Sequence, residues 1–198
     1  MSHKWLGAIM DNFGRSINCL PSSGFTVSII DRDYVIKYWK KSNLPPIDYQ
    51  LSLFCRKLFE DVWAFYPNFF DWIDRKFIPG LINGEREIVI ISERGNLLGY
   101  SALKKTHKEN KICTLYVKGF ARNSGIGTIL LNVSKIRLNE DRPLITVSED
   151  RIELFESMFN KNNFKLVNSI NNLYLDGKKE YVFNKEMTTD ESSIVDKA

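Results

Sequence analysis

The chain has 198 residues, of which 43% are hydrophobic and 26% are charged, and its formal net charge is +4. This composition is typical of a soluble globular domain that folds around its own hydrophobic core without a disulfide or a metal. The three cysteines are widely spaced, there are only two histidines, and no apolar run approaches the roughly 20 residues of a membrane span. We therefore expect no metal site, no membrane association and a cytoplasmic location.

Apolar spacing and turn residues divide the first half of the chain into strand and helix segments. Residues 1–24 are interpreted as an irregular N-terminal arm, and Pro45-Pro46 and Pro79-Gly80 are expected to break the chain. The elements predicted there are a strand (25–30), a segment that fits a helix or a strand (31–41), a helix (47–66) and a second helical segment (70–77).

The second half predicts a three-stranded antiparallel meander followed by alternating helices and strands. Its elements are strands 87–92, 97–104 and 111–117, helix 126–138, strand 143–148, helix 152–160, and strands 164–167 and 181–184. The strand–helix–strand order implies one parallel pair inside a mixed sheet. We predict a mixed α/β (α+β) fold over residues 25–186, with a twisted, mostly antiparallel sheet of about six to seven strands and about four helices. Residues 187–198 are predicted to form a disordered acidic tail.

A glycine-containing loop joins the third meander strand to the helix that follows it. Glycines remove the side chains that would hold a phosphate at a distance, and the free N–H groups at a helix start carry partial positive charge. The loop does not fit GxGxxG, because Leu130 takes the last glycine position, and it does not fit the P-loop, because no lysine follows either glycine. What remains is Arg-x-x-Gly-x-Gly, formed by Arg122, Gly125 and Gly127.

This pattern resembles the pyrophosphate-binding signature Arg/Gln-x-x-Gly-x-Gly/Ala of the GNAT superfamily of acetyl-CoA-dependent N-acetyltransferases. A second stretch, from Phe159 to Phe164, is similar to a Tyr-x-Lys-x-Gly-Phe-like phrase of that family, with Asn163 where glycine is usual. Asparagine tolerates the left-handed backbone at a helix end, so the exchange is physically inexpensive. The resemblance implies an acyl-CoA N-acyltransferase fold in which the parallel pair of strands splays apart.

The resemblance also implies the reaction and the cofactor contacts. An acetyl group would pass by direct attack from acetyl-CoA (coenzyme A as cosubstrate) to a primary amine of a small molecule, a peptide or a protein. The residues expected to bind the cofactor are Leu115, Tyr116, Val117, Arg122, Asn123, Ser124, Gly125, Ile126, Gly127 and Thr128.

The catalytic groups are less defined by the resemblance than the cofactor loop. The attacking amine must lose a proton, and Glu149 is the predicted general base, with helix capping by Glu149 and Asp150 as the alternative. Many family members use a tyrosine on the last helix to protonate the leaving thiolate, but Phe159 stands at that position. Ser148, Tyr116 or water are the remaining candidates for that role, and Tyr116 also fits a simple packing role.

Other functions fit the same sequence. The tail contributes −2, so the rest of the chain carries +6, which suits a phosphate-bearing cofactor, RNA or ordinary surface lysines. A toxin-type acetyltransferase of aminoacyl-tRNA, a non-catalytic GNAT-fold interaction module and an ATP-binding protein remain open, as does a homodimer. Two measurements distinguish these hypotheses. One is whether the protein releases free thiol from acetyl-CoA, and the other is whether ATP or coenzyme A raises its thermal stability.

Overall fold

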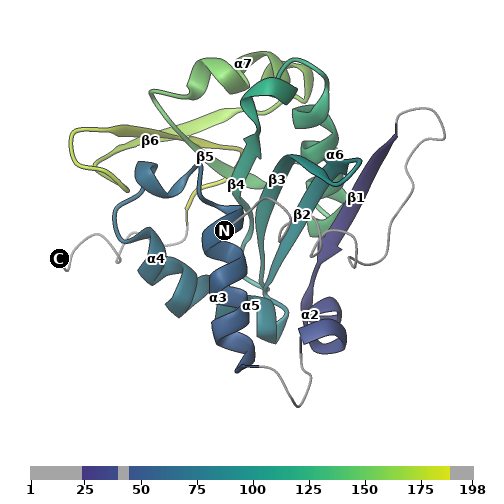
Figure 1. Ribbon diagram of the computed structural model, residues 1–198. Helices are drawn as coiled ribbons and strands as arrows, with labels where there is room; N and C mark the ends of the chain where they lie inside the picture. Colours follow the sequence, from purple (N-terminus) through teal and green to yellow (C-terminus); the bar gives the residue numbers. More distant parts are fainter. Residues whose placement is uncertain (1–23, 40–44, 188–198) are drawn as a thin grey trace.

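The computed structural model describes residues 24–39 and 45–187, and the described chain builds one seven-stranded sheet with helices on both faces (Figure 1). The predicted arm over residues 1–24 and the predicted tail over residues 187–198 lie almost entirely outside the described residues. The strands are β1 (Phe25–Ile30), β2 (Arg86–Glu93), β3 (Asn96–Lys105), β4 (Asn110–Val117), β5 (Leu144–Ser148), β6 (Leu166–Asn171) and β7 (Lys179–Phe183). The helices are α2 (Arg32–Trp39), α3 (Ile47–Leu58), α4 (Phe69–Trp72), α5 (Ile78–Asn83), α6 (Ile126–Leu138) and α7 (Ile152–Lys161).

The strands lie in the order β1-β2-β3-β4-β5-β7-β6. All neighbouring pairs are antiparallel except β4 and β5, which are parallel and are connected through α6. The predicted mixed α/β fold, with a mostly antiparallel sheet and one parallel pair, is confirmed. No helix in the described part of the chain is long and apolar enough to cross a membrane.

Two predicted helical segments differ from the observed ones. The helix that begins at Ile47 ends at Leu58 rather than at residue 66, and a 3₁₀ turn follows at Trp63–Phe65. Phe59 and Val62 stay buried beyond the helix end, so the apolar spacing continues although the backbone is no longer helical.

Pro79 does not end the second helical segment. It lies in the first turn of α5, where a proline has no helical N–H to lose, and the helix ends at Gly84 with φ of 90°. A π-helical turn at Ile73–Phe77 joins α4 to α5. The segment that fitted a helix or a strand in the sequence forms helix α2 over Arg32–Trp39. Asp31 caps its first turn, because its Oδ1 accepts the Tyr34 N–H at 3.0 Å.

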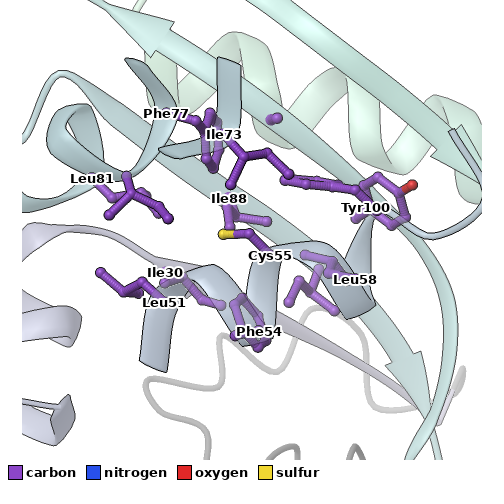
Figure 2. Packing of buried hydrophobic residues seen from close by; sticks show 14 of the residues in the cluster. Ile30, Leu51, Phe54, Cys55, Leu58, Ile73, Phe77, Leu81, Ile88 and Tyr100 are labelled. Carbon is purple, nitrogen blue, oxygen red and sulfur yellow. The ribbon is translucent and has the colours of Figure 1, made fainter. Parts of the chain in front are cut away.

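Both faces of the sheet are covered by apolar cores. On β2, Ile88 and Ile90 face one core whereas Val89 and Ile91 face the other, which is why the strand is hydrophobic throughout. The first core packs α2 to α5 against the sheet, and Figure 2 shows part of it, including Tyr100. The second core packs α6 and α7 against the opposite face. In the view of Figure 1, α3 and α5 lie in front of the strands.

Candidate active site

The parallel strands β4 and β5 stay together only at one end. Their register contains two pairs, Lys111 with Leu144 and Ile112 with Ile145, and then the pairing stops. On its other side β4 keeps its pairing with β3 to Val117, across a shift that leaves Cys113 as an extra residue. Because a β-bulge bends and twists the strand that carries it, this bulge turns β4 away from β5 directly after Ile112.

The gap between β4 and β5 is a cavity of about 620 Å³. Residues of β4 and β5 form two of its walls, and one side of α7 forms a third wall. The 3₁₀ turn near Tyr66 borders the cavity on the face of the sheet opposite to α7. Beyond Ile112, β4 and β5 form no further strand pairs. An extended ligand that enters the gap could therefore pair with the edge of β4 between Thr114 and Val117.

The glycine loop lies at the open end of this gap. A 3₁₀ turn (Gly119–Ala121) leads into an exposed turn, and α6 begins after Gly125, whose φ is 87°. A Cβ at Gly125 would meet nothing within 4 Å, and one at Gly127 would lie 3.7 Å from Met158 and Val117. Space is thus open in front of the N-terminal amides of a 13-residue helix, which suits a phosphate group.

A buried carboxylate faces the cavity from β7. Glu180 is 4% exposed and lines the gap, and its Oε2 atom has no hydrogen-bond partner among the described residues. Burial raises the pKa of this carboxyl from 4.5 to about 7, although the nearby Lys111 ammonium opposes the shift. A carboxyl group with these properties can both accept and release a proton near neutral pH.

Aromatic and basic groups surround that carboxylate. The Lys111 ammonium donates to the Tyr174 hydroxyl at 3.1 Å, and the rings of Tyr66 and Tyr174 meet edge to face at 5.6 Å. Burial, followed by the charge of Glu180, raises the pKa of Tyr66, so this phenol stays protonated. Together these groups form a polar cluster beside Glu180, in which Tyr66 lines the cavity.

Residues 50–142 match the model of the acetyltransferase (GNAT) family. Three solved structures superpose on most of the chain with little sequence identity. A putative GNAT acetyltransferase from Desulfovibrio desulfuricans has a TM-score of 0.53 and 18% identity, and the match covers 79% of this chain and 96% of that chain. Naa50 of Arabidopsis thaliana, in complex with the bisubstrate analogue CoA-Ac-MVNAL, has a TM-score of 0.52 and 18% identity, with 81% of this chain and 99% of that chain covered. A GNAT-family acetyltransferase from Bacillus cereus has a TM-score of 0.52 and 14% identity, with 84% of this chain and 100% of that chain covered.

This chain has the GNAT fold. The fold that the resemblance implied is therefore confirmed. No curated protein sequence matches the chain.

The GNAT signature residues and their neighbours mostly gather at the cavity. The lining includes eight of the ten predicted cofactor residues, namely Leu115, Tyr116, Val117, Arg122, Asn123, Gly125, Gly127 and Thr128. Ser124 and Ile126 do not line it. The Ser124 hydroxyl donates to the Ala121 carbonyl at 2.6 Å and shapes the turn, and the Ile126 side chain is buried in the core beneath α6.

The predicted catalytic residues separate into two groups. Ser148 and Tyr116 line the cavity, and the Tyr116 ring packs on Tyr100 at 5.4 Å between centroids. Glu149 is exposed outside the cavity, where its Oε1 accepts the backbone N–H of Lys179 at 3.3 Å. Neither Glu149 nor Asp150 caps α7. The N-cap residue of this helix is Arg151, whose side chain makes no capping hydrogen bond.

Phe159 belongs to the core rather than to the cavity wall. It is 2% exposed and packs against Phe155, Phe164 and Phe183. The face of α7 that borders the gap instead presents Ser157 and Met158. A tyrosine at position 159 would thus not reach the cavity in this structure.

The sequence does not mark Glu180 as a site residue, because nothing around it resembles a motif. It lies in the last strand, and only the pairing of β7 with β5 brings it opposite Ser148. The available signal was an acidic residue at an inward position of an otherwise apolar strand, between Lys179 and Tyr181.

Proposed function

We propose that this protein is an N-acetyltransferase that transfers the acetyl group of acetyl-CoA to a primary amine by direct attack. The observation that carries the proposal is the buried Glu180 carboxylate, which faces the gap between the splayed strands β4 and β5 and has an oxygen without a partner. Burying an acidic group in this way costs stability, and such a cost is typical of a functional site.

The proposed cofactor site combines the gap with the glycine loop. Main-chain groups of Leu115 to Val117 would bond the extended arm of coenzyme A, because β5 leaves them unpaired. The amides at the start of α6 would bind its diphosphate, with Arg122 beside them. Acetyl-CoA supplies the activated thioester when bound.

Glu180 is the proposed general base in place of Glu149. An alkylammonium has a pKa near 10 and becomes a nucleophile only when a base removes its proton. The Glu180 carboxyl has a pKa of about 7 and faces the cavity, whereas the Glu149 carboxylate is held on the outside by Lys179. Glu180 would therefore accept the proton of the bound ammonium.

The step balances without a further reagent. The amine nitrogen forms a bond to the acetyl carbon, the carbon–sulfur bond breaks, and sulfur leaves with the electron pair. The thiolate then takes a proton from water, from Tyr116 or from Ser148, both of which line the cavity. Because a thiol has a pKa of about 8.5, the thiolate is also a tolerable leaving group by itself.

The test measures free thiol after the protein is mixed with acetyl-CoA and a panel of amines. Glu180→Gln is expected to lower kcat/KM by about 100- to 10,000-fold, the usual contribution of a general base, without changing CoA affinity. Glu149→Gln is the matched variant and is expected to leave kcat/KM unchanged. Cofactor binding without turnover on any amine would instead support a non-catalytic module, and a loss of activity only in Glu149→Gln would restore the base predicted from the sequence.

A further inference from the structure

A cation without an acidic partner lies at the edge of the cavity. Arg151 stands between β5 and α7 and lines the gap, and its guanidinium carbon is 4.0 Å from the centre of the Phe65 ring. Within the described residues its guanidinium takes part in no ion pair. The neighbouring Asp150 does not neutralise it, because that carboxylate already pairs with Lys178 at 2.8 Å.

The position of Arg151 is fixed rather than adaptable. Its backbone N–H donates to the Ser148 carbonyl at 2.9 Å, which anchors the residue to the end of β5. Stacking on the face of Phe65 then holds the planar guanidinium and leaves the donors at its edges available. A guanidinium fork held in this way matches the two oxygens of a carboxylate.

Arg151 shares the acceptor side of the cavity with Glu180. Ser148, which anchors Arg151, is also the residue directly opposite Glu180 in the pairing of β5 with β7. Glu180 and Arg151 both line the cavity, and the charges of both act on the Tyr66 phenol. A carboxyl group and a guanidinium group therefore lie on the walls of the same cavity.

The charges of this space select the type of amine. Lys111 is 3% exposed and adds a second cation near Glu180. A polycationic amine would meet two like charges and one carboxylate there, which is unfavourable in a poorly solvated site. An amine that carries its own carboxylate would present a positive group to Glu180 and a negative group to Arg151.

We propose that the acceptor is an amino acid or a comparable small amino-carboxylate, whose carboxylate is bound by Arg151 while Glu180 receives the proton of its amine. The inference rests on the proposed N-acetyltransferase function and adds the substrate class to it. Phe65 and Tyr66 form the aromatic side of the acceptor pocket, and Tyr174 packs edge to face against Tyr66.

The experiment compares acceptors that differ only in the carboxylate. Common L-amino acids, their carboxamides and the corresponding amines without the carboxyl carbon are supplied with acetyl-CoA, and kcat/KM is obtained from thiol release. The carboxylate is expected to raise kcat/KM by about 10- to 100-fold over the carboxamide, the usual effect of a hydrogen bond to a charged group. In Arg151→Gln this preference is expected to disappear, mainly through KM, whereas Arg151→Lys should retain part of it.

Two controls separate the acceptor role of Arg151 from other roles. CoA affinity, measured by calorimetry, is expected to be the same in Arg151→Gln and in the unchanged protein. Arg75→Gln removes an exposed arginine, whose side chain is 78% accessible, and is expected to alter neither CoA affinity nor acceptor preference.

The outcomes distinguish this inference from the proposed function. Turnover with equal kcat/KM for amino acids and their carboxamides would overturn the substrate class and leave the N-acetyltransferase function intact. Weaker CoA binding in Arg151→Gln would assign Arg151 to the cofactor and overturn its acceptor role. Absence of turnover on every amine would overturn both proposals together.

Discussion

Removing the charge of Glu180 is expected to stabilise the protein while it abolishes activity. The folded state raises the pKa of this carboxyl from 4.5 to about 7, so folding favours its protonated form. Its contribution to stability is therefore complete below pH 4.5 and is lost as the pH rises through about 7. Glu180→Gln keeps the shape of the protonated side chain and cannot ionise, so it avoids that loss.

The size of the effect follows from the two pKa values. A tenfold change in a proton equilibrium is worth about 1.4 kcal/mol, so a rise from 4.5 to about 7 corresponds to at most about 3 kcal/mol. The cavity is open to solvent and the Lys111 ammonium lies nearby, so part of this cost is screened. We expect Glu180→Gln to gain on the order of 1–2 kcal/mol at about pH 8 and only about a quarter of that at about pH 5.

The assay is urea unfolding of both proteins at the two pH values, with equal slopes required before stabilities are compared. The Lys111 ammonium and the Tyr66 phenol lie near Glu180, and burial raises the pKa of Tyr66, so this phenol keeps its proton at both pH values. Glu149→Gln, on the outside, serves as the control and should show no such difference. Equal stability of Glu180→Gln and the unchanged protein at about pH 8 would refute the reasoning, because Glu180 would then be ionised without cost.

Four further substitutions test the glycine loop and the packing around the site. Gly125→Glu and Gly127→Glu each put a negative side chain where the diphosphate is proposed to bind. Calorimetry should therefore detect no CoA binding, whereas the circular dichroism spectrum should stay unchanged. Unaltered CoA affinity in both variants would refute the loop assignment. Gly99→Ala places a Cβ 2.6 Å from the Tyr116 carbonyl oxygen, and unfolding should show a loss of about 1–3 kcal/mol, an expectation that an unaltered midpoint would contradict. Phe159→Tyr buries a hydroxyl in a core of phenylalanines and should cost about 1–3 kcal/mol without raising kcat, whereas higher activity would show that position 159 reaches the substrate.

The strand, glycine loop and helix proposed to bind the cofactor could be predicted from the sequence because their signals are local. A strand, two glycines and an amphipathic helix follow one another within residues 111–138, and each has its own signal. The helical residues before them were harder to delimit, since Phe59 and Val62 continue the apolar spacing after α3 has ended. At Pro79 a residue that usually breaks a helix occupies its first turn, which spacing alone does not reveal.

The proposed role of Glu180 depends on contacts between distant segments, which the sequence alone does not reveal. Glu149 and Glu180 are both acidic residues at a strand end, and their local sequences do not distinguish them. Their difference arises when β7 inserts between β5 and β6, because Glu180 then faces the gap opposite Ser148 while Glu149 bonds the backbone at Lys179.

The bulge at Cys113 has a similar origin. No glycine or proline marks it, and it appears only in the pairing of β4 with β3. Yet this one extra residue separates β4 from β5 and so creates the space that Glu180 faces. An opening of the sheet and a carboxylate buried beside it would each be a defect alone, since one leaves backbone groups unpaired and the other leaves a charge without a partner. Together they supply what the proposed acetyl transfer needs, because the open edge of β4 can bind the arm of coenzyme A and the Glu180 carboxyl can accept the proton of the attacking amine.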